Sequence, residues 1–329
     1  MKFMRAGVLS IVAAAVATTV VAGQVQDPAA KAASILAESR KALGGDDKIA
    51  AIKTLEIKGT ARRGAADVNI EGDMTIVMER PGKYLRKEQI LLGNGGIDVV
   101  EGLNGDESWD EQKFSGGMNF DDGGDGGRRG GGGFRGGGAP GQQPAAGATP
   151  DETAKKAALA ARQSEVARIA LALFLTTDQP VKYTGTAVTP QMTAEVLEMT
   201  APDGSAVRLI VDSKTYLPLM LQWTGIAQDP IAALAARAGF RGRGRGGRGG
   251  FFGGRQGQQQ QPQQAAKVVS ADELAKPTAL RMYLQDYKTV NGIKLPHLLI
   301  RGTGDQVTEE WEIKSYKINP NLKADTFKK

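Results

Sequence analysis

The stretch that decides the fold is residues 68–79, VNIEGDMTIVME. Apolar or small side chains occupy every second position of this stretch: Val68, Ile70, Gly72, Met74, Ile76 and Met78. Polar side chains lie between them, with Val77 as the exception. Because successive side chains of a strand point to opposite faces, the alternation predicts an antiparallel strand with one buried face.

The segments around this strand repeat the pattern. Pro81-Gly82 predicts a turn directly after it, and Asn291-Gly292 predicts a tight hairpin turn near the end of the chain. We predict further strands at residues 55–57, 84–92, 97–101, 107–114, 182–188, 194–200, 207–212, 218–225, 280–290, 293–303 and 307–317.

Helical spacing occurs in only three places. Asp27 and Pro28 are typical of a helix start, and Gly44-Gly45 of its end. A second, short helix should carry Ile49 and Ile52, and a long one should run from residue 151 to an apolar end at Phe174. The order helix, several antiparallel strands, helix, more strands indicates an α+β fold: one curved antiparallel sheet with few helices.

Three segments stand apart from this fold. Residues 1–22 carry Lys2 and Arg5 before an apolar run that ends in small residues, which is typical of a secretory signal peptide; the alternative is an N-terminal membrane anchor. Residues 115–150 and 236–266 are glycine-rich and nearly free of apolar side chains, so we expect two disordered insertions. The remaining chain, 23–329, should then be a single exported domain in the periplasm.

Composition removes most enzyme classes. The chain has no Cys and one His, His297, which excludes thiol nucleophiles and multi-His metal sites. We therefore expect no catalytic residues, no metal and no cofactor.

The net charge of +6 is a local feature. Six arginines lie within residues 237–255 without an acid, as in segments that bind nucleic acid. Export argues against nucleic acid as a partner. The alternatives are a solvated surface loop, or an envelope interaction protein that binds anionic surfaces or polymers through this Arg-Gly-rich tract.

Methionines suggest where a ligand would bind. Five of them, at positions 74, 78, 199, 220 and 282, fall in predicted strands, and methionine adapts its shape to irregular apolar partners. Ordinary core packing is the alternative for each one. A broad apolar sheet face under few helices would leave a hydrophobic cavity. The candidate lining residues are Met74, Ile76, Met78, Met220, Leu173 and Phe174.

Several motifs resemble a known family. Residues 71–84 (EGDMTIVMERPGKY) and 102–109 (GLNGDESW) are similar to a strand-turn segment and the next hairpin of LolA-like periplasmic lipoprotein carriers, the outer-membrane lipoprotein-sorting proteins. The helix ending at Phe174, the strands within 206–221 and the motif at 323–327 fit in the same order.

The resemblance implies an unclosed β-barrel covered by a helical lid, with acyl chains bound in its interior. It also implies that the Arg before Pro, here Arg80, holds the lid by hydrogen bonds. We therefore expect a non-enzymatic, monomeric carrier for lipidated or hydrophobic ligands. Its partners would be a lipid or acylated protein and inner- or outer-membrane proteins. The glycine-rich insertions depart from the family pattern.

Overall fold

The computed structural model describes residues 27–65, 68–92, 95–116, 152–226, 277–304 and 306–329. The predicted signal peptide, 1–22, and the insertion 236–266 lie outside these residues, as does 117–150 of the other insertion. Residues 115–116 end a strand. The predicted domain organisation therefore stays a prediction.

The described strands form one 12-stranded sheet in which every neighbouring pair is antiparallel. The strand order is β5-β4-β3-β2-β1-β12-β11-β10-β9-β8-β7-β6, so β5 and β6 are its two edges and the sheet is not closed. The strands are β1 (Thr54–Ala65), β2 (Val68–Glu79), β3 (Lys83–Leu92), β4 (Gly95–Asn104), β5 (Glu107–Gly116), β6 (Lys182–Val188), β7 (Thr193–Thr200), β8 (Ala206–Asp212), β9 (Pro218–Ile226), β10 (Pro277–Val290), β11 (Ile293–Thr303) and β12 (Gln306–Ile318).

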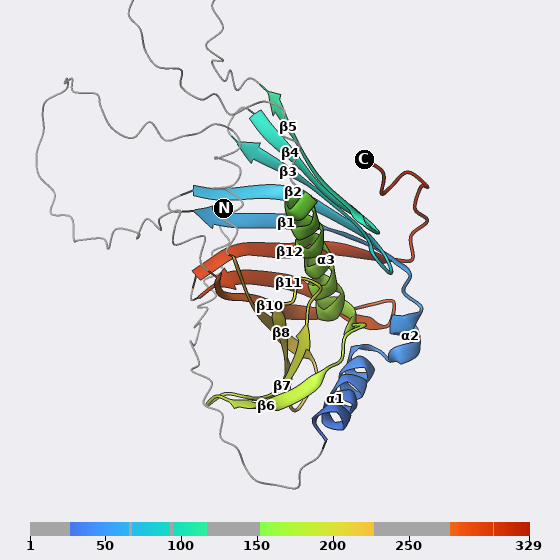
Figure 1. Cartoon of the computed structure of the whole chain (residues 1–329), viewed down its shortest axis with the longest axis vertical. Coiled ribbons are helices and arrows are strands. Elements are labelled where there is room, and N and C mark those ends of the chain that lie inside the picture. Colours follow the sequence, from blue (N-terminus) through green and yellow to red (C-terminus); the bar gives the residue numbers. More distant parts are fainter. Residues whose placement is uncertain (1–26, 66–67, 93–94, 117–151, 227–276, 305) are drawn as a thin grey trace, which may run out of the picture.

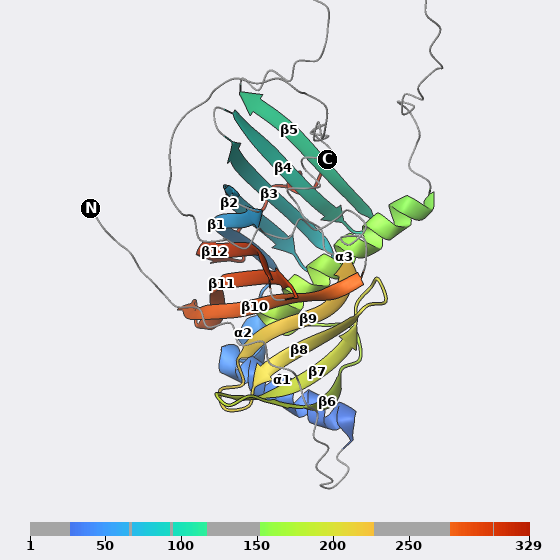
Figure 2. The same ribbon diagram turned by 90° about the vertical axis from the view of Figure 1, so that its left-hand side faces the viewer.

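The first and the last strand meet in the middle of the sheet. β1 pairs with β12 from Leu55 opposite Ile318 to Arg63 opposite Glu309, with one bulge after Lys58. This pair, which we call the seam, joins one arm made of β1–β5 to a second arm made of β6–β12. Figures 1 and 2 show the two arms curving round one helix.

The helices are α1 (Pro28–Leu43), α2 (Asp46–Ala50) and α3 (Glu152–Phe174). Asp27 Oδ1 accepts a hydrogen bond of 3.1 Å from Ala29 N, and Gly44, at φ 140°, ends α1 in a conformation that favours glycine. α1 packs against β6 and β11, whereas α3 lies along the inner face of the sheet (Figure 1). The predicted fold, a curved antiparallel sheet covered by a few helices, is confirmed.

The main core lies between the helices and this inner face. Its largest fully buried side chains include Trp311, Tyr84 and Phe174. The outer face has a separate cluster in which Val77 and Leu85 pack against Phe327 near the chain end. Val77 breaks the alternation of residues 68–79 because it is covered by this C-terminal segment.

Candidate functional site

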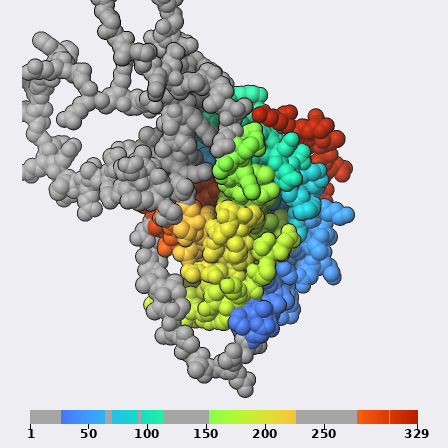
Figure 3. All heavy atoms as spheres, in the orientation of Figure 1, coloured from blue at the N-terminus to red at the C-terminus, as the bar shows by residue number. Residues whose placement is uncertain are grey.

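The inner face of the sheet has an apolar end and a charged end. In-phase side chains of β2 are Met74, Ile76 and Met78, all at most 2% exposed. On the neighbouring β3, the in-phase positions after Tyr84 are Arg86 and Glu88, which are buried as well. They lie opposite Ile76 and Met74 in register, so the apolar and charged ends meet within this strand pair. α3 covers both ends, and in the space-filling view its start is seen at the surface between the two arms (Figure 3).

Five of the six residues predicted to line a ligand site lie together in the core cluster between β2 and α3. Met74, Ile76, Met78, Leu173 and Phe174 are each at most 2% exposed. α3 itself fills much of the expected interior. Of the five, Met78 lines the apolar cavity described below, and the other four line neither of the two cavities described here.

Met220, the sixth, lies elsewhere. Its neighbour Leu221 is fully buried in the core on the inner face. Because side chains alternate along β9, Met220 points to the outer face, where it is half-buried and pairs in register with Ile210 and Tyr283. The prediction placed it in a strand correctly but had no means to fix its phase.

Arg80 joins three elements. It follows β2, and its Nη1 donates to the backbone oxygens of Ile49 and Ile52, both at 3.3 Å, at the end of α2 and just beyond it. Its guanidinium also lies 5.6 Å from the ring centroid of Phe174, the last residue of α3. Burial lowers the pKa of Arg80, and Asp178 offsets part of this effect. Arg80 is thus placed to hold α2 and the end of α3 against the sheet.

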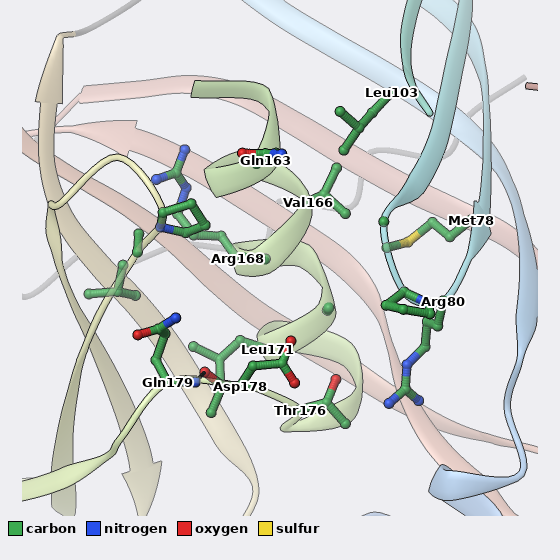
Figure 4. Close-up of a pocket in the computed structure, with 18 of the residues that line it drawn as sticks. Met78, Arg80, Leu103, Gln163, Val166, Arg168, Leu171, Thr176, Asp178 and Gln179 are labelled. Atoms are coloured by element: carbon green, nitrogen blue, oxygen red, sulfur yellow. Dashed lines mark hydrogen bonds between the residues drawn. The ribbon is translucent and has the colours of Figure 1, made fainter. Parts of the chain in front are cut away.

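An apolar cavity of about 330 Å³ opens beside Arg80 (Figure 4). Side chains from four places line it: the end of β2 with the turn into β3, one position of β4, α3 with the segment after it, and the ends of β7 and β8 with the turn between them. They include Met78, Leu103, Val166, Leu171, Met199 and Val207. In Figure 4, Arg80 lies on one side of the cavity and Arg168 on the other. The cavity therefore lies between the two arms, and side chains of α3 form part of its lining.

The charged end holds a buried quartet that the sequence analysis missed. Arg63 donates to both oxygens of Glu88 and, at 2.5 Å, to Glu309. Arg86 donates to the same two carboxylates at 2.9 and 2.7 Å. All four side chains are at most 8% exposed, and they come from β1, β3 and β12. Two positive and two negative charges thus neutralise one another inside the fold.

The middle of α3 is attached to the charged end through ion pairs. Arg162 contacts Glu101 at 2.9 Å and Asp110 at 2.6 Å, and Glu165 accepts a hydrogen bond from Arg301. Burial by itself raises the pKa of Glu165, but Arg301 and then other arginines offset this effect and lower it to about 2. A second cavity, of about 620 Å³, lies among these groups.

A weak signal for the charged end was present in the sequence. In β3, Arg86 and Glu88 keep the two-residue phase of Tyr84 and Ile90, so charges stand where apolar residues were expected. Only the pairing of strands distant in sequence shows that Arg63, on β1, and Glu309, on β12, face them. The sequence predicted an apolar cavity and did not predict this second cavity of about 620 Å³, which is lined by many ionised side chains.

Other kinds of site are not seen in the described ranges. Among those residues, no group of three or more His, Asp or Glu side chains is placed to hold a metal ion. His297 is buried, with Nδ1 3.1 Å from the Leu295 oxygen and its ring edge-on to Tyr316. None of the helices described in the structure has the length and apolar character to cross a membrane.

No protein-family model matches the chain, and no curated protein matches it either. Similar solved structures include a putative outer membrane lipoprotein-sorting protein domain from Vibrio parahaemolyticus (9% identity, 91% of this chain and 97% of that chain covered, TM-score 0.41). A LolA superfamily protein from Nitrosomonas europaea is 10% identical, with 91% of this chain and 97% of that chain covered and a TM-score of 0.41. A DUF1329 family protein from Desulfovibrio piger is 8% identical, with 92% of this chain and 98% of that chain covered and a TM-score of 0.41. LolA is also the superfamily that the sequence motifs resemble. The function proposed below rests on the geometry of Arg80 and the two cavities.

Proposed function

We propose that the chain is a periplasmic binding or carrier protein for lipidated or hydrophobic ligands, such as acylated proteins. The observation that carries this proposal is the apolar cavity between the two arms, closed at one side by Arg80. Its volume of about 330 Å³ lies at the lower end of the range for small-molecule sites. A longer acyl chain would need the cavity to widen, which the arrangement around Arg80 permits.

Widening would exchange weak contacts for apolar burial. The two hydrogen bonds of Arg80 are long, at 3.3 Å, and the backbone oxygens that accept them belong to a five-residue helix and the turn after it. Burial of an acyl chain yields about 0.8 kcal/mol per methylene. A few methylenes therefore offset the loss of both bonds, each worth about 1 kcal/mol. Arg80 can thus hold the site closed when empty and release α2 when a chain enters.

Native mass spectrometry of the exported protein, followed by extraction of bound molecules, tests the proposal. We expect co-purified phospholipid, fatty acid or acylated peptide, or uptake of such ligands when they are added. A protein that is empty and takes up none of them would contradict the proposal. A variant lacking residues 236–266 should bind equally well; loss of binding in that variant would favour the Arg-Gly-rich tract as the binding segment.

Replacing Arg80 with leucine should speed ligand uptake by about tenfold and lower the free energy of unfolding by only about 1–2 kcal/mol. The variant loses two long hydrogen bonds and the contact with Phe174, which hold the empty site closed, but it keeps the apolar core. Stopped-flow mixing with a fluorescent fatty acid measures the uptake rate, and chemical denaturation measures the stability.

The matched control is Arg40→Leu. Arg40 also donates to a backbone oxygen, that of Leu175, but it does not line the apolar cavity. It should lose similar stability and keep the wild-type uptake rate. Equal uptake rates in all three proteins would remove the proposed role of Arg80.

A further inference from the structure

Arg168 is the one side chain on α3 that lines both cavities. It lies on the helix face between the apolar space near Met78 and the charged space near Arg63. Its guanidinium lies 4.8 Å from the ring centroid of Trp223, which also lines the charged cavity. This cation–π contact holds the guanidinium against the ring and uses none of the hydrogen-bond donors of Arg168.

The hydrogen-bonding capacity of Arg168 is underused. The side chain is nine-tenths buried, yet Nε and Nη1 have no hydrogen-bond partner. Its ion contacts are long: 3.5 Å from Nη2 to Glu165 and 3.7 Å from Nη1 to Asp203. Both acids have closer partners, because Glu165 bonds Arg301 and Asp203 bonds Ser205 at 2.6 and 2.9 Å. A buried donor without an acceptor is costly, so this position favours an additional anion.

We propose that Arg168 binds the acidic headgroup of an amphiphile whose hydrocarbon tail occupies the apolar cavity. This inference rests on the proposed function and narrows its ligand class to single-chain molecules with a terminal carboxylate or phosphate. The tail would lie against Met78, Leu103 and Val166, and the headgroup would reach past α3 to the free N–H edge of Arg168.

The charge around Arg168 sets how such a ligand would be recognised. Arg168 and Arg301 face Glu165 and Asp203, so the immediate surroundings are neutral. A neutral site does not attract anions from a distance, and buried contacts are little screened by salt. Binding should therefore depend on direct hydrogen bonds and change little with ionic strength, in contrast to binding by an exposed arginine-rich segment.

The test compares ligands with one tail and three headgroups at pH 8: dodecanoic acid, dodecyl phosphate and dodecanol, each titrated calorimetrically into the full exported chain. We expect the wild-type protein to bind one or both acids about 10- to 100-fold more tightly than the alcohol, the usual range for a charge-assisted hydrogen bond. The acid that binds more tightly identifies the headgroup as carboxylate or phosphate.

Arg168→Gln should bring the acid affinity down to that of the alcohol and leave the alcohol affinity unchanged. The control is Arg208→Gln, an exposed arginine on β8 that contacts Glu198 and lines neither cavity; it should behave as wild type. The comparison of ligands on the wild-type protein needs no variant, so the proposal remains testable if Arg168→Gln does not fold.

Three results would overturn the inference. Equal binding of acids and alcohol to the wild-type protein would do so while leaving the proposed function intact. Acid binding that falls steeply with salt and disappears without residues 236–266 would place the anion site in the Arg-Gly-rich tract. No binding of any of the three ligands would overturn the inference and count against the proposed function as well.

Discussion

Replacing Arg63 with methionine should lower the free energy of unfolding by about 3–5 kcal/mol, the usual cost of removing one partner from a buried ion pair. Arg63 is 5% exposed and donates to Glu88 and Glu309. Without it, the two buried carboxylates keep Arg86 as their close partner, with Arg301 3.7 Å from Glu309. Urea denaturation of the wild-type and variant proteins measures the difference.

The adjacent residue provides a matched control. Arg62 also contacts three carboxylate oxygens, of Glu71, Glu310 and Glu312, but it lies on the outer face and its side chain is 45% exposed. Exposed ion pairs contribute about 0–1 kcal/mol each, so Arg62→Met should cost far less than Arg63→Met. Equal losses in the two variants would show that the burial of the quartet does not determine its contribution.

Acid should destabilise the protein between about pH 4.5 and pH 2. The pKa of Glu165 falls from 4.5 to about 2 on folding, since the nearby arginines more than offset the effect of burial. A lowered pKa contributes stability above the unfolded value, and this contribution is lost as pH falls through the folded value. For Glu165 alone it amounts to roughly 3 kcal/mol. The pKa of Glu309 is lowered too, by Arg86, Arg63 and Arg301 against the effect of burial, and adds to the loss.

Denaturation curves recorded at several pH values measure this effect. Between about pH 4.5 and pH 2, the unfolded chain binds one more proton at Glu165 than the folded chain does. The free energy of unfolding should therefore change with a slope of about 1.4 kcal/mol per pH unit. Glu165→Gln should lower the overall stability and remove that slope. The control on the same helix is Glu152→Gln, whose side chain is 89% exposed and contacts only Lys155 among the ion pairs found; it should keep the full slope. An unchanged slope in Glu165→Gln would contradict the assignment.

Much of the fold could be predicted because local patterns decide it. The two-residue alternation of residues 68–79 placed β2, and the same pattern placed the other strands; Asp27 and Gly44 marked the ends of α1. The order of the strands in the sheet could not be predicted from the sequence. No local pattern states that Leu55 pairs with Ile318, since that pairing depends on the packing of the whole sheet.

The candidate site was predictable to a lesser extent. Arg80 came from a family resemblance. In the structure it donates to the backbone oxygens of Ile49 and Ile52, and its role in holding a lid stays a prediction. Arg168 lies on a helix where its spacing resembles that of any solvated arginine, and only the tertiary arrangement buries it over Trp223. Charges buried in compensating pairs cannot be distinguished in a sequence from charges on a surface.

The seam also has a consequence for the order of folding. The strands within β1–β5 join neighbours in sequence and can form early, but β1 must wait for β12, the last strand, about 250 residues away. Until then β1 is an open edge that could pair with another chain. Arg63 then points inward with no Glu309 to meet it, and an inward charge discourages apolar partners from that edge. Arg63, which is neutralised within the quartet of the finished sheet, would thus also protect the unfinished sheet from aggregation.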